Sequence, residues 1–200
     1  MTRLRWSGRR AVTLAAVLAV AAAGVATVLL TAGGADRDPI VVRDVGIDVR
    51  DGPNRDEYVR LDATVYLPRR TPAPAILLAH GFGGSKESVV EQARELAGDG
   101  FVVLAYTARG FGRSTGQIAL NSPDYEVVDA QALVDWLAAR PEVRTDRPGD
   151  PRIGVSGSSY GGALALMLAG TDRRIDAVVP MITWNDLSAA LLPNAAGAGP

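Results

Sequence analysis

Residues 152–168 read RIGVSGSSYGGALALML, and they decide the fold because a glycine-rich turn in them joins a β-prone run to an apolar, helix-prone run. The turn, Gly157-Ser158-Ser159-Tyr160-Gly161, has the G-x-S-x-G pattern of a nucleophile elbow in its strand–turn–helix context. Such a turn strains the backbone at the central Ser159 and holds its hydroxyl clear of the sheet. Glycines flank it because a Cβ there would crowd the neighbouring strand and helix. The following helix directs its N-terminal N–H groups at the place where negative charge would develop. The same pattern also arises by chance in Gly/Ser-rich loops between a strand and a helix, so the flanking elements support the catalytic interpretation.

The composition indicates one globular domain with a hydrophobic core. The 200 residues are 48% hydrophobic and 22% charged, and the net charge is −1. This balance argues against nucleic-acid binding and gives no sign of a strongly charged partner. Because the sequence has no cysteine, disulfides, thiolate zinc sites and cysteine nucleophiles are excluded. There is one histidine, His80, and nothing indicates a cofactor or a metal site.

A charge-free, mostly apolar run extends from residue 11 to about residue 32, behind Arg3, Arg5, Arg9 and Arg10. Its length of about 22 residues suffices to span a bilayer as a helix, whereas the apolar part of a signal peptide usually has about 7–15 residues. We therefore expect residues 1–35 to be an N-terminal signal or membrane anchor. Length favours the uncleaved anchor, and cleavage near Gly33-Gly34-Ala35 remains open. Since the arginines keep the N-terminus in the cytoplasm, residues 36–200 should form an extracytoplasmic domain at the cell membrane, or a secreted one after cleavage.

The rest of the chain alternates between strand and helix patterns. Strands over residues 41–49 and 58–66 form a hairpin around Asp51-Gly52-Pro53-Asn54. The continuous apolar run at 75–79 is typical of a strand buried in a parallel sheet. Further strands are expected at 101–106, before the elbow and at 175–181. Helices are expected at about 87–97 and from Ser122-Pro123 onwards, and 141–151 reads as a charged loop. The core stripe of the second helix is Val127, Ala130, Val134 and Leu137. This alternation predicts an α/β fold: a mostly parallel, doubly wound sheet that begins with an antiparallel hairpin, without internal repeats or a second domain.

A second glycine-rich loop, His80-Gly81-Phe82-Gly83-Gly84-Ser85, follows the 75–79 strand directly. An acyl-transfer site needs two backbone N–H groups for its oxyanion: one from the residue after the nucleophile, here Tyr160, and one from such a loop, here Phe82. A phosphate-binding loop fits poorly, because Gly84-Ser85-Lys86 breaks the order Gly-Lys-Ser/Thr. No G-x-G-x-x-G is present either.

Together these elements resemble α/β-hydrolases, and more narrowly the X-Pro dipeptidyl-peptidase and cocaine-esterase-like acyl hydrolase family, over about residues 41–187. The residues that carry the resemblance are His80-Gly81-Phe82-Gly83-Gly84, Arg109-Gly110-Phe111-Gly112-Arg113-Ser114, Glu126-Val127-Val128-Asp129 with Trp136-Leu137, and Gly157-Ser158-Ser159-Tyr160-Gly161-Gly162.

The resemblance implies an α/β-hydrolase fold and a two-step serine mechanism. Ser159 would attack a carbonyl, the N–H groups of Phe82 and Tyr160 would hold the oxyanion, and water would release the acyl group. The substrates it implies are amides following proline, or simple esters. Thr107 departs from the pattern, since such hydrolases usually have Asp there, and it leaves Arg109 without that local carboxylate. Phe82 has no hydroxyl to add to the oxyanion hole, so backbone donors must suffice.

The triad acid and base have no candidates in the expected places. α/β-Hydrolases run in the order Ser, Asp or Glu, His, but no histidine follows Ser159. His80 begins the oxyanion loop, where similar proteins use a structural histidine, so we expect it to brace that loop. Asp186 is expected to start a helix or a lid. We therefore expect this sequence to be the N-terminal part of a longer serine hydrolase, a peptidase or esterase, that is truncated before its last strands and is inactive and poorly soluble alone. A non-catalytic binding module of the same fold and an inactive truncated product are the alternatives.

Overall fold

The computed structural model describes residues 40–54 and 57–191. The expected signal or anchor over residues 1–35, with its apolar run, lies outside the described residues. Within them, no helix combines the length and the apolarity needed to cross a bilayer.

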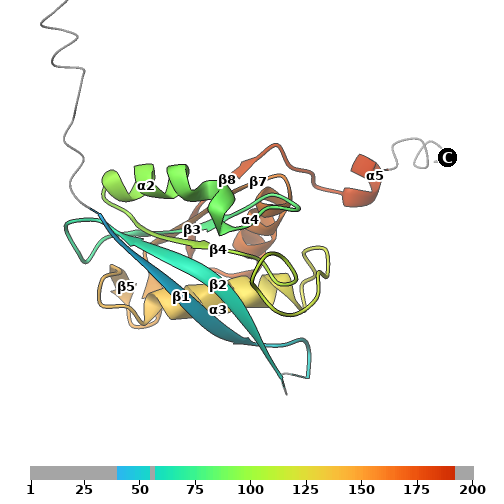
Figure 1. Ribbon diagram of the computed structural model, residues 1–200, viewed down its shortest axis with the longest axis horizontal. Helices are drawn as coiled ribbons and strands as arrows, with labels where there is room; N and C mark the ends of the chain where they lie inside the picture. Colours follow the sequence, from blue (N-terminus) through green and yellow to red (C-terminus); the bar gives the residue numbers. More distant parts are fainter. Residues whose placement is uncertain (1–39, 55–56, 192–200) are drawn as a thin grey trace, which may run out of the picture. The chain divides into compact units, whose positions relative to one another are not determined.

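The strands form one main sheet of mixed direction (Figure 1). Its strands are β1 (Val41–Arg50), β2 (Tyr58–Leu67), β3 (Ala75–Ala79), β4 (Val102–Tyr106), β7 (Ile153–Ser158) and β8 (Ile175–Met181). They lie in the order β1-β2-β4-β3-β7-β8. β1 pairs with β2 and β2 with β4 in antiparallel fashion, whereas β4, β3, β7 and β8 are parallel to one another. The predicted hairpin and the predicted parallel sheet are both confirmed.

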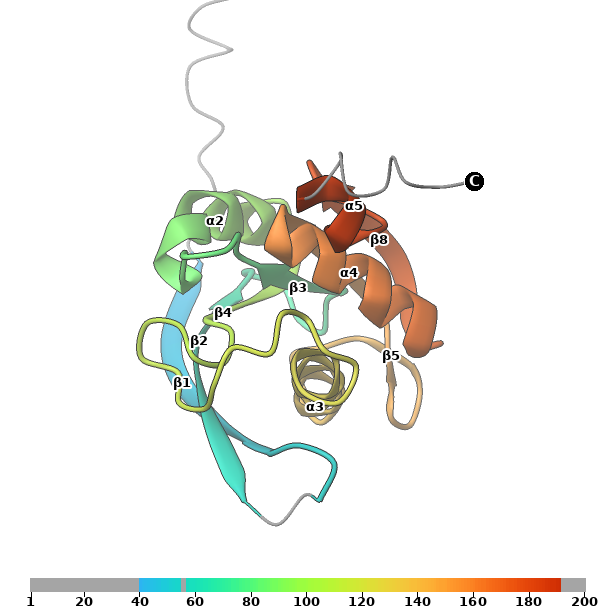
Figure 2. The same ribbon diagram turned by 90° about the vertical axis from the view of Figure 1, so that its right-hand side faces the viewer.

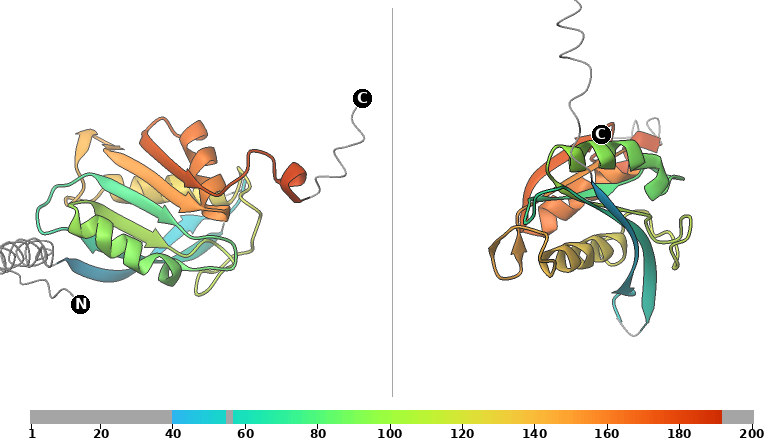
Figure 3. Two further views of the ribbon diagram at one scale, coloured as in Figure 1. Left: turned by 90° about the horizontal axis from the view of Figure 1, so that it is seen from above. Right: turned by 60° about the vertical axis from the view of Figure 1, so that its left-hand side comes forward.

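Helices cover both faces of this sheet, as a doubly wound fold requires (Figures 1 and 2). A 3₁₀ turn, η1 (Lys86–Val89), leads into α2 (Val90–Gly98), which covers one face; Figure 3, left, looks onto that face. α3 (Glu126–Ala138) and α4 (Tyr160–Thr171) pack on the other face. A short helix, α5 (Leu187–Leu191), follows β8.

The side chains of the central strands alternate between two apolar cores. Leu78 and Val103 face α2, where Ala93 and Ala97 meet them. The larger core, on the α3 and α4 side, contains Leu77, Leu104, Val155, Leu133 and Leu164, together with the predicted stripe of α3. Because both faces of β3 and β4 are buried, these strands are continuously apolar, which explains why the sequence showed no alternation there.

Within the described residues β8 pairs only with β7, so it forms an edge of the sheet. Most of its residues are exposed, including Val178 and Val179. A strand of this apolar composition at an open edge is unusual.

Two sequence-based expectations about local structure were wrong. α3 begins at Glu126 and not at Ser122-Pro123, because the Ser122 hydroxyl accepts the N–H of Asp124 and closes a turn, while the carboxylate of Glu126 accepts the N–H of Ser122. Residues 141–151 are not only a loop. They contain a small antiparallel pair of strands, β5 (Thr145–Arg147) and β6 (Asp150–Pro151).

Candidate active site

Ser159 stands at the sharp turn between β7 and α4, in a conformation that non-glycine residues rarely adopt. Its φ is 54° and its ψ is −115°. The backbone is held on both sides, since the N–H of Ser159 donates to the carbonyl of Met181 (2.9 Å) and its own carbonyl accepts the N–H of Ala163 (3.0 Å). A strained turn that neighbouring segments hold in place through hydrogen bonds is typical of functional sites. This conformation agrees with the predicted elbow.

The glycines on either side of Ser159 are required by close packing. A Cβ on Gly157 would lie 2.5 Å from the carbonyl of Gly161, and a Cβ on Gly161 would lie 2.5 Å from the carbonyl oxygen of Ala79. Both distances are far below van der Waals contact. The start of α4 therefore approaches the ends of β7 and β3 as closely as two backbones can, as the sequence predicted.

The loop after β3 passes directly beside this turn. Ala79 at the end of β3 pairs with Gly157 of β7, so the two strands end side by side. A Cβ on Gly81 would lie 3.6 Å from the carbonyl oxygen of Ser158 and 3.9 Å from Cβ of Ser159. The fold thus brings together the two segments that the sequence assigned to an oxyanion hole.

Phe82 and Tyr160, whose N–H groups are the candidate oxyanion donors, also touch through their rings. The ring of Phe82 lies edge-on to that of Tyr160, with centroids 5.5 Å apart, and edge-on to that of Phe111 at 5.2 Å. Phe82 is nevertheless 61% exposed, while Tyr160 is buried. Phe82 is therefore the solvent-facing rim of a small aromatic cluster beside Ser159.

His80 braces the loop after β3, as predicted, and both of its ring nitrogens are engaged. Nε2 accepts the N–H of Ala108 (2.9 Å), which leaves the proton on Nδ1 to be donated to the carbonyl of Gly81 (2.7 Å). The residue is only 2% exposed, and this burial lowers the pKa of His80 below its usual value. Because each ring nitrogen of the neutral imidazole already takes part in a hydrogen bond, neither is free to take a proton from Ser159.

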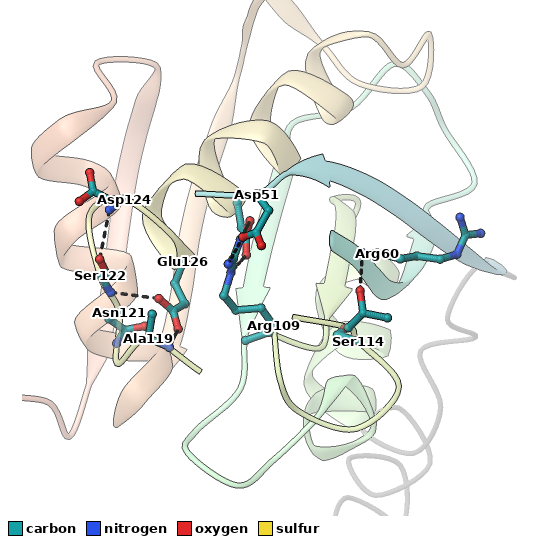
Figure 4. A network of polar contacts seen from close by, with 12 residues as sticks. Asp51, Arg60, Arg109, Ser114, Ala119, Asn121, Ser122, Asp124 and Glu126 are labelled. Carbon is teal, nitrogen blue, oxygen red and sulfur yellow. Dashed lines mark hydrogen bonds and ion pairs between the residues drawn. The ribbon is translucent and has the colours of Figure 1, made fainter. Parts of the chain in front are cut away.

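A buried polar network fixes the ring of Tyr160, and Figure 4 shows its members Asn121 and Glu126. The Tyr160 hydroxyl donates to Glu126 (3.1 Å) and accepts the N–H of Asn121 (3.1 Å), while the Asn121 side chain donates to the Tyr160 carbonyl (2.8 Å). Glu126 also accepts the N–H of Ala119 (2.6 Å) and that of Ser122 (3.0 Å). Burial, reinforced by the Glu126 carboxylate, raises the pKa of the Tyr160 hydroxyl.

Sequence reasoning missed the role of Asn121 and treated Glu126 only as part of a motif. The available signal was Glu126 itself, an acidic residue that directly precedes the apolar stripe of α3. No sequence pattern pointed to Asn121, because its φ of 59° and its contact with Tyr160 arise only in the folded chain.

Arg109 is fully braced, which corrects the expectation based on Thr107. Arg109 is 2% exposed, donates twice to Asp129 of α3 (2.7 Å each) and donates once to Asp51 in the β1–β2 turn (2.5 Å; Figure 4). Thr107 instead contacts the start of η1, where its hydroxyl accepts the N–H of Lys86 (3.1 Å). The carboxylates come from distant parts of the chain, which is why a local search did not find them.

Asp186 starts a helix, as predicted. Its Oδ1 accepts the hydroxyl proton of Ser188 (2.7 Å) and the N–H of Ala189 (3.1 Å) at the beginning of α5. The bond from Ser188 is the main reason why the pKa of Asp186 is lowered. Asp186 is exposed, and these hydrogen bonds direct its carboxylate to the first turn of α5. In the described part of the chain, no three His, Cys, Asp or Glu side chains are arranged to hold a metal ion.

Comparison with known proteins agrees with this geometry. The profile of the family described as X-Pro dipeptidyl-peptidase (S15 family) matches residues 51–197. The uncharacterised protein PA2218 of Pseudomonas aeruginosa is 37% identical over 126 residues, which are 60% of this chain and 33% of that protein. Its crystal structure superposes with a TM-score of 0.62, 30% identity, and coverage of 78% of this chain and 48% of that one.

Two relatives carry names that describe an activity. The bis(hydroxyethyl) terephthalate hydrolase of Streptomyces coelicolor is 30% identical over 125 residues, covering 61% of this chain and 37% of that protein. A hyperthermophilic esterase from Pyrobaculum calidifontis superposes with a TM-score of 0.54 and 28% identity, covering 74% of this chain and 45% of that one. The chain thus spans less than half the length of these relatives. Its fold is that of the α/β-hydrolases, since an α/β-hydrolase from Penicillium superposes with a TM-score of 0.58 at 20% identity, covering 75% of this chain and 48% of that one.

Proposed function

Because the chain belongs to the X-Pro dipeptidyl-peptidase (S15) family, we propose that it serves in a serine hydrolase that cleaves esters or post-proline amides through an acyl-enzyme on Ser159. The observation that carries this proposal is the conformation of Ser159. A serine at φ 54°, at the strand–helix turn where the loop after β3 passes, has no structural advantage over glycine. A turn of this kind serves to present the hydroxyl of its central serine to a substrate.

In the proposed reaction Oγ of Ser159 attacks the carbonyl carbon of the substrate and gives its proton to a general base. The carbonyl oxygen becomes an oxyanion, which accepts hydrogen bonds from the N–H groups of Phe82 and Tyr160 and lies near the positive end of α4. The bond to the alcohol or amine then breaks as that group takes the proton, leaving an acyl-enzyme on Ser159. A water molecule repeats the attack and frees the acid and the serine.

The general base is not a histidine of this sequence. The only histidine is His80, and both of its nitrogens are occupied within the loop that it braces. We therefore propose that residues beyond these 200 supply the base and the acid, and that the 200-residue chain alone does not turn over substrate.

Esters are the substrates that we propose to test first. The names of two relatives, a terephthalate ester hydrolase and an esterase, support them, whereas the family description supports amides after proline. The chain's own rim residue, Phe82, offers an exposed ring against which an aromatic or aliphatic acyl group can pack. For location, we propose an extracytoplasmic enzyme that residues 11–32 anchor in the membrane, or that is secreted after cleavage.

The test uses the protein in the form in which its own cells accumulate it. Its intact mass is compared with 20.9 kDa. It is then treated with a fluorophosphonate probe and assayed with p-nitrophenyl acetate and with Ala-Pro-p-nitroanilide. Labelling and turnover that vanish in Ser159→Ala but persist in the neighbouring Ser158→Ala are the expected result. Equal labelling of both variants would refute the assignment of Ser159.

The second candidate is a binding module with an α/β-hydrolase fold and no catalysis. The engagement of the only histidine favours it, because the described elbow then lacks a base. An intact mass of 20.9 kDa or slightly less, with no probe labelling, is the outcome that this candidate predicts.

A further inference from the structure

The end of β8 and the residues directly after it hold Ser159 from both sides of its α-carbon. The N–H of Ser159 donates to the carbonyl of Met181 (2.9 Å), and the hydroxyl of Thr183 donates to the carbonyl of Ser159 (2.9 Å). Two residues that are separated by a single residue in the chain therefore hold the strained Ser159 in place. No sequence pattern indicated this contact, since Thr183 lies 24 residues beyond Ser159.

The residue between them adopts a backbone conformation that its side chain disfavours. Ile182 has a φ of 47°, in the left-handed region where a β-branched residue is a genuine outlier. The residue is 90% exposed, so burial of its side chain does not offset this strain. What the conformation achieves is to turn the chain so that the Met181 carbonyl and the Thr183 hydroxyl both reach Ser159. Strain of this kind clusters at sites that depend on a fixed geometry.

α4 is shaped to admit this segment. A Cβ on Gly162 would lie 2.9 Å from Cβ of Thr183 and 3.0 Å from the carbonyl oxygen of Met181. Any side chain at Gly162 would push the segment away from the elbow. The second glycine after Tyr160 is thus explained by the approach of Met181 and Thr183, together with the Gly157 carbonyl oxygen of the turn, which the Cβ would meet at 3.1 Å.

The carbonyl that Thr183 binds belongs to the same peptide group as the N–H of Tyr160. This carbonyl accepts two hydrogen bonds, from the Thr183 hydroxyl and from the N–H of Ala163. Two bonds in different directions fix the plane of the peptide, and thereby the direction of the N–H at its other end. A hydrogen bond to a carbonyl also polarises its amide, which makes the N–H a stronger donor.

We infer that Thr183 is a positioning residue whose hydroxyl orients the Ser159–Tyr160 peptide so that the Tyr160 N–H points at the oxyanion. This inference rests on the proposed function, in which that N–H is an oxyanion donor. Because an oxyanion forms only after attack on the carbonyl, losing the hydroxyl lowers kcat and leaves KM nearly unchanged.

The experiment compares two replacements of Thr183 in the full-length protein. Thr183→Val keeps the shape and removes the hydroxyl, whereas Thr183→Ser keeps the hydroxyl. Thr183→Val should lower kcat at least about tenfold, less than the roughly 100- to 1,000-fold that follows removal of an oxyanion donor itself. Thr183→Ser should recover most of that loss. The matched control is Thr171→Val at the far end of α4, where a threonine hydroxyl also donates to a backbone carbonyl, that of Met167 (2.8 Å).

A second readout needs no activity. The amide resonance of Tyr160 in an ¹⁵N–¹H spectrum should shift in Thr183→Val, and it should stay near its original position in Thr183→Ser and Thr171→Val. If Thr183→Val does not fold, Thr183→Ala takes its place in both measurements.

The outcomes separate the two hypotheses. Absence of Ser159-dependent hydrolysis in the unmodified protein refutes the proposed function, and the Tyr160 resonance then decides the orienting role by itself. Hydrolysis that falls equally in Thr183→Val and Thr183→Ser overturns the inference, because the hydroxyl is then not responsible. An unmoved Tyr160 resonance in Thr183→Val overturns it as well.

Discussion

Replacement of Asp129 by alanine should lower the free energy of unfolding by about 3–5 kcal/mol, because it leaves the guanidinium of Arg109 buried without its main partner. Arg109 donates to Asp129 through Nε and Nη2, at 2.7 Å each, and to Asp51 through Nη1. Hydrogen bonds between charged groups contribute about 1.5–3 kcal/mol each, so losing two gives about 3–6 kcal/mol, in agreement with the first figure. Asp51 is already engaged and cannot replace the lost carboxylate.

The assay is urea unfolding of the full-length protein followed by circular dichroism. With a slope of about 2 kcal/mol per molar urea, the midpoint should fall by about 2 M. Asp135→Ala, on the same helix α3, is the matched control. Asp135 pairs with Arg174 but its side chain is 68% exposed, so its removal should cost less than about 1 kcal/mol. Equal losses in the two variants would refute the claim that burial makes the Arg109 pair important.

A double variant tests the reason for the loss. Arg109→Met with Asp129→Leu removes both charges and keeps apolar bulk in their place, so it should be less destabilised than Asp129→Ala alone. A double variant that is less stable than Asp129→Ala would show that the pair contributes more than the avoidance of an unpaired charge.

Two further predictions use the same unfolding assay. Gly161→Ala should lower the free energy of unfolding by at least about 3 kcal/mol or prevent folding, because the new Cβ meets the Ala79 carbonyl oxygen at 2.5 Å. Gly170→Ala on the same helix meets nothing within 4 Å and should raise the free energy of unfolding by about 0.5–1 kcal/mol. A similar loss in both variants would contradict the packing argument. Burial lowers the pKa of His80 below 6.5, so the unfolded chain binds its proton at a higher pH than the native protein. The contribution of neutral His80 to the free energy of unfolding is therefore complete above the pKa of the unfolded chain. The free energy of unfolding falls as the pH drops from about 7 to 5, by up to about 1.4 kcal/mol per pH unit. His80→Asn should make this dependence on pH less steep. An unchanged slope in that variant would assign the pH dependence to other groups.

The sequence by itself determined the elements of the fold whose causes are local. The turn residues Asp51-Gly52-Pro53-Asn54 between two strand-like runs predicted the hairpin, and the uninterrupted apolar run at 75–79 predicted a strand buried on both faces. The order of motifs along the chain identified the elbow at Ser159 and the loop from His80, because glycine spacing reflects how closely backbones must pass. These patterns depend on neighbours in the chain, and so they are visible without a structure.

Contacts between distant segments were decided only by the tertiary structure. The carboxylates that hold Arg109 come from 20 and 58 residues away, so the departure at Thr107 suggested a weakness that the fold does not have. The start of α3 moved to Glu126 because its carboxylate binds the chain that precedes it. Hydrogen bonds and ion pairs between such segments depend on direction and distance in space, and a one-dimensional pattern contains neither. The clamp of Thr183 on Ser159 belongs to the same class, since it exists only where β8 ends beside β7.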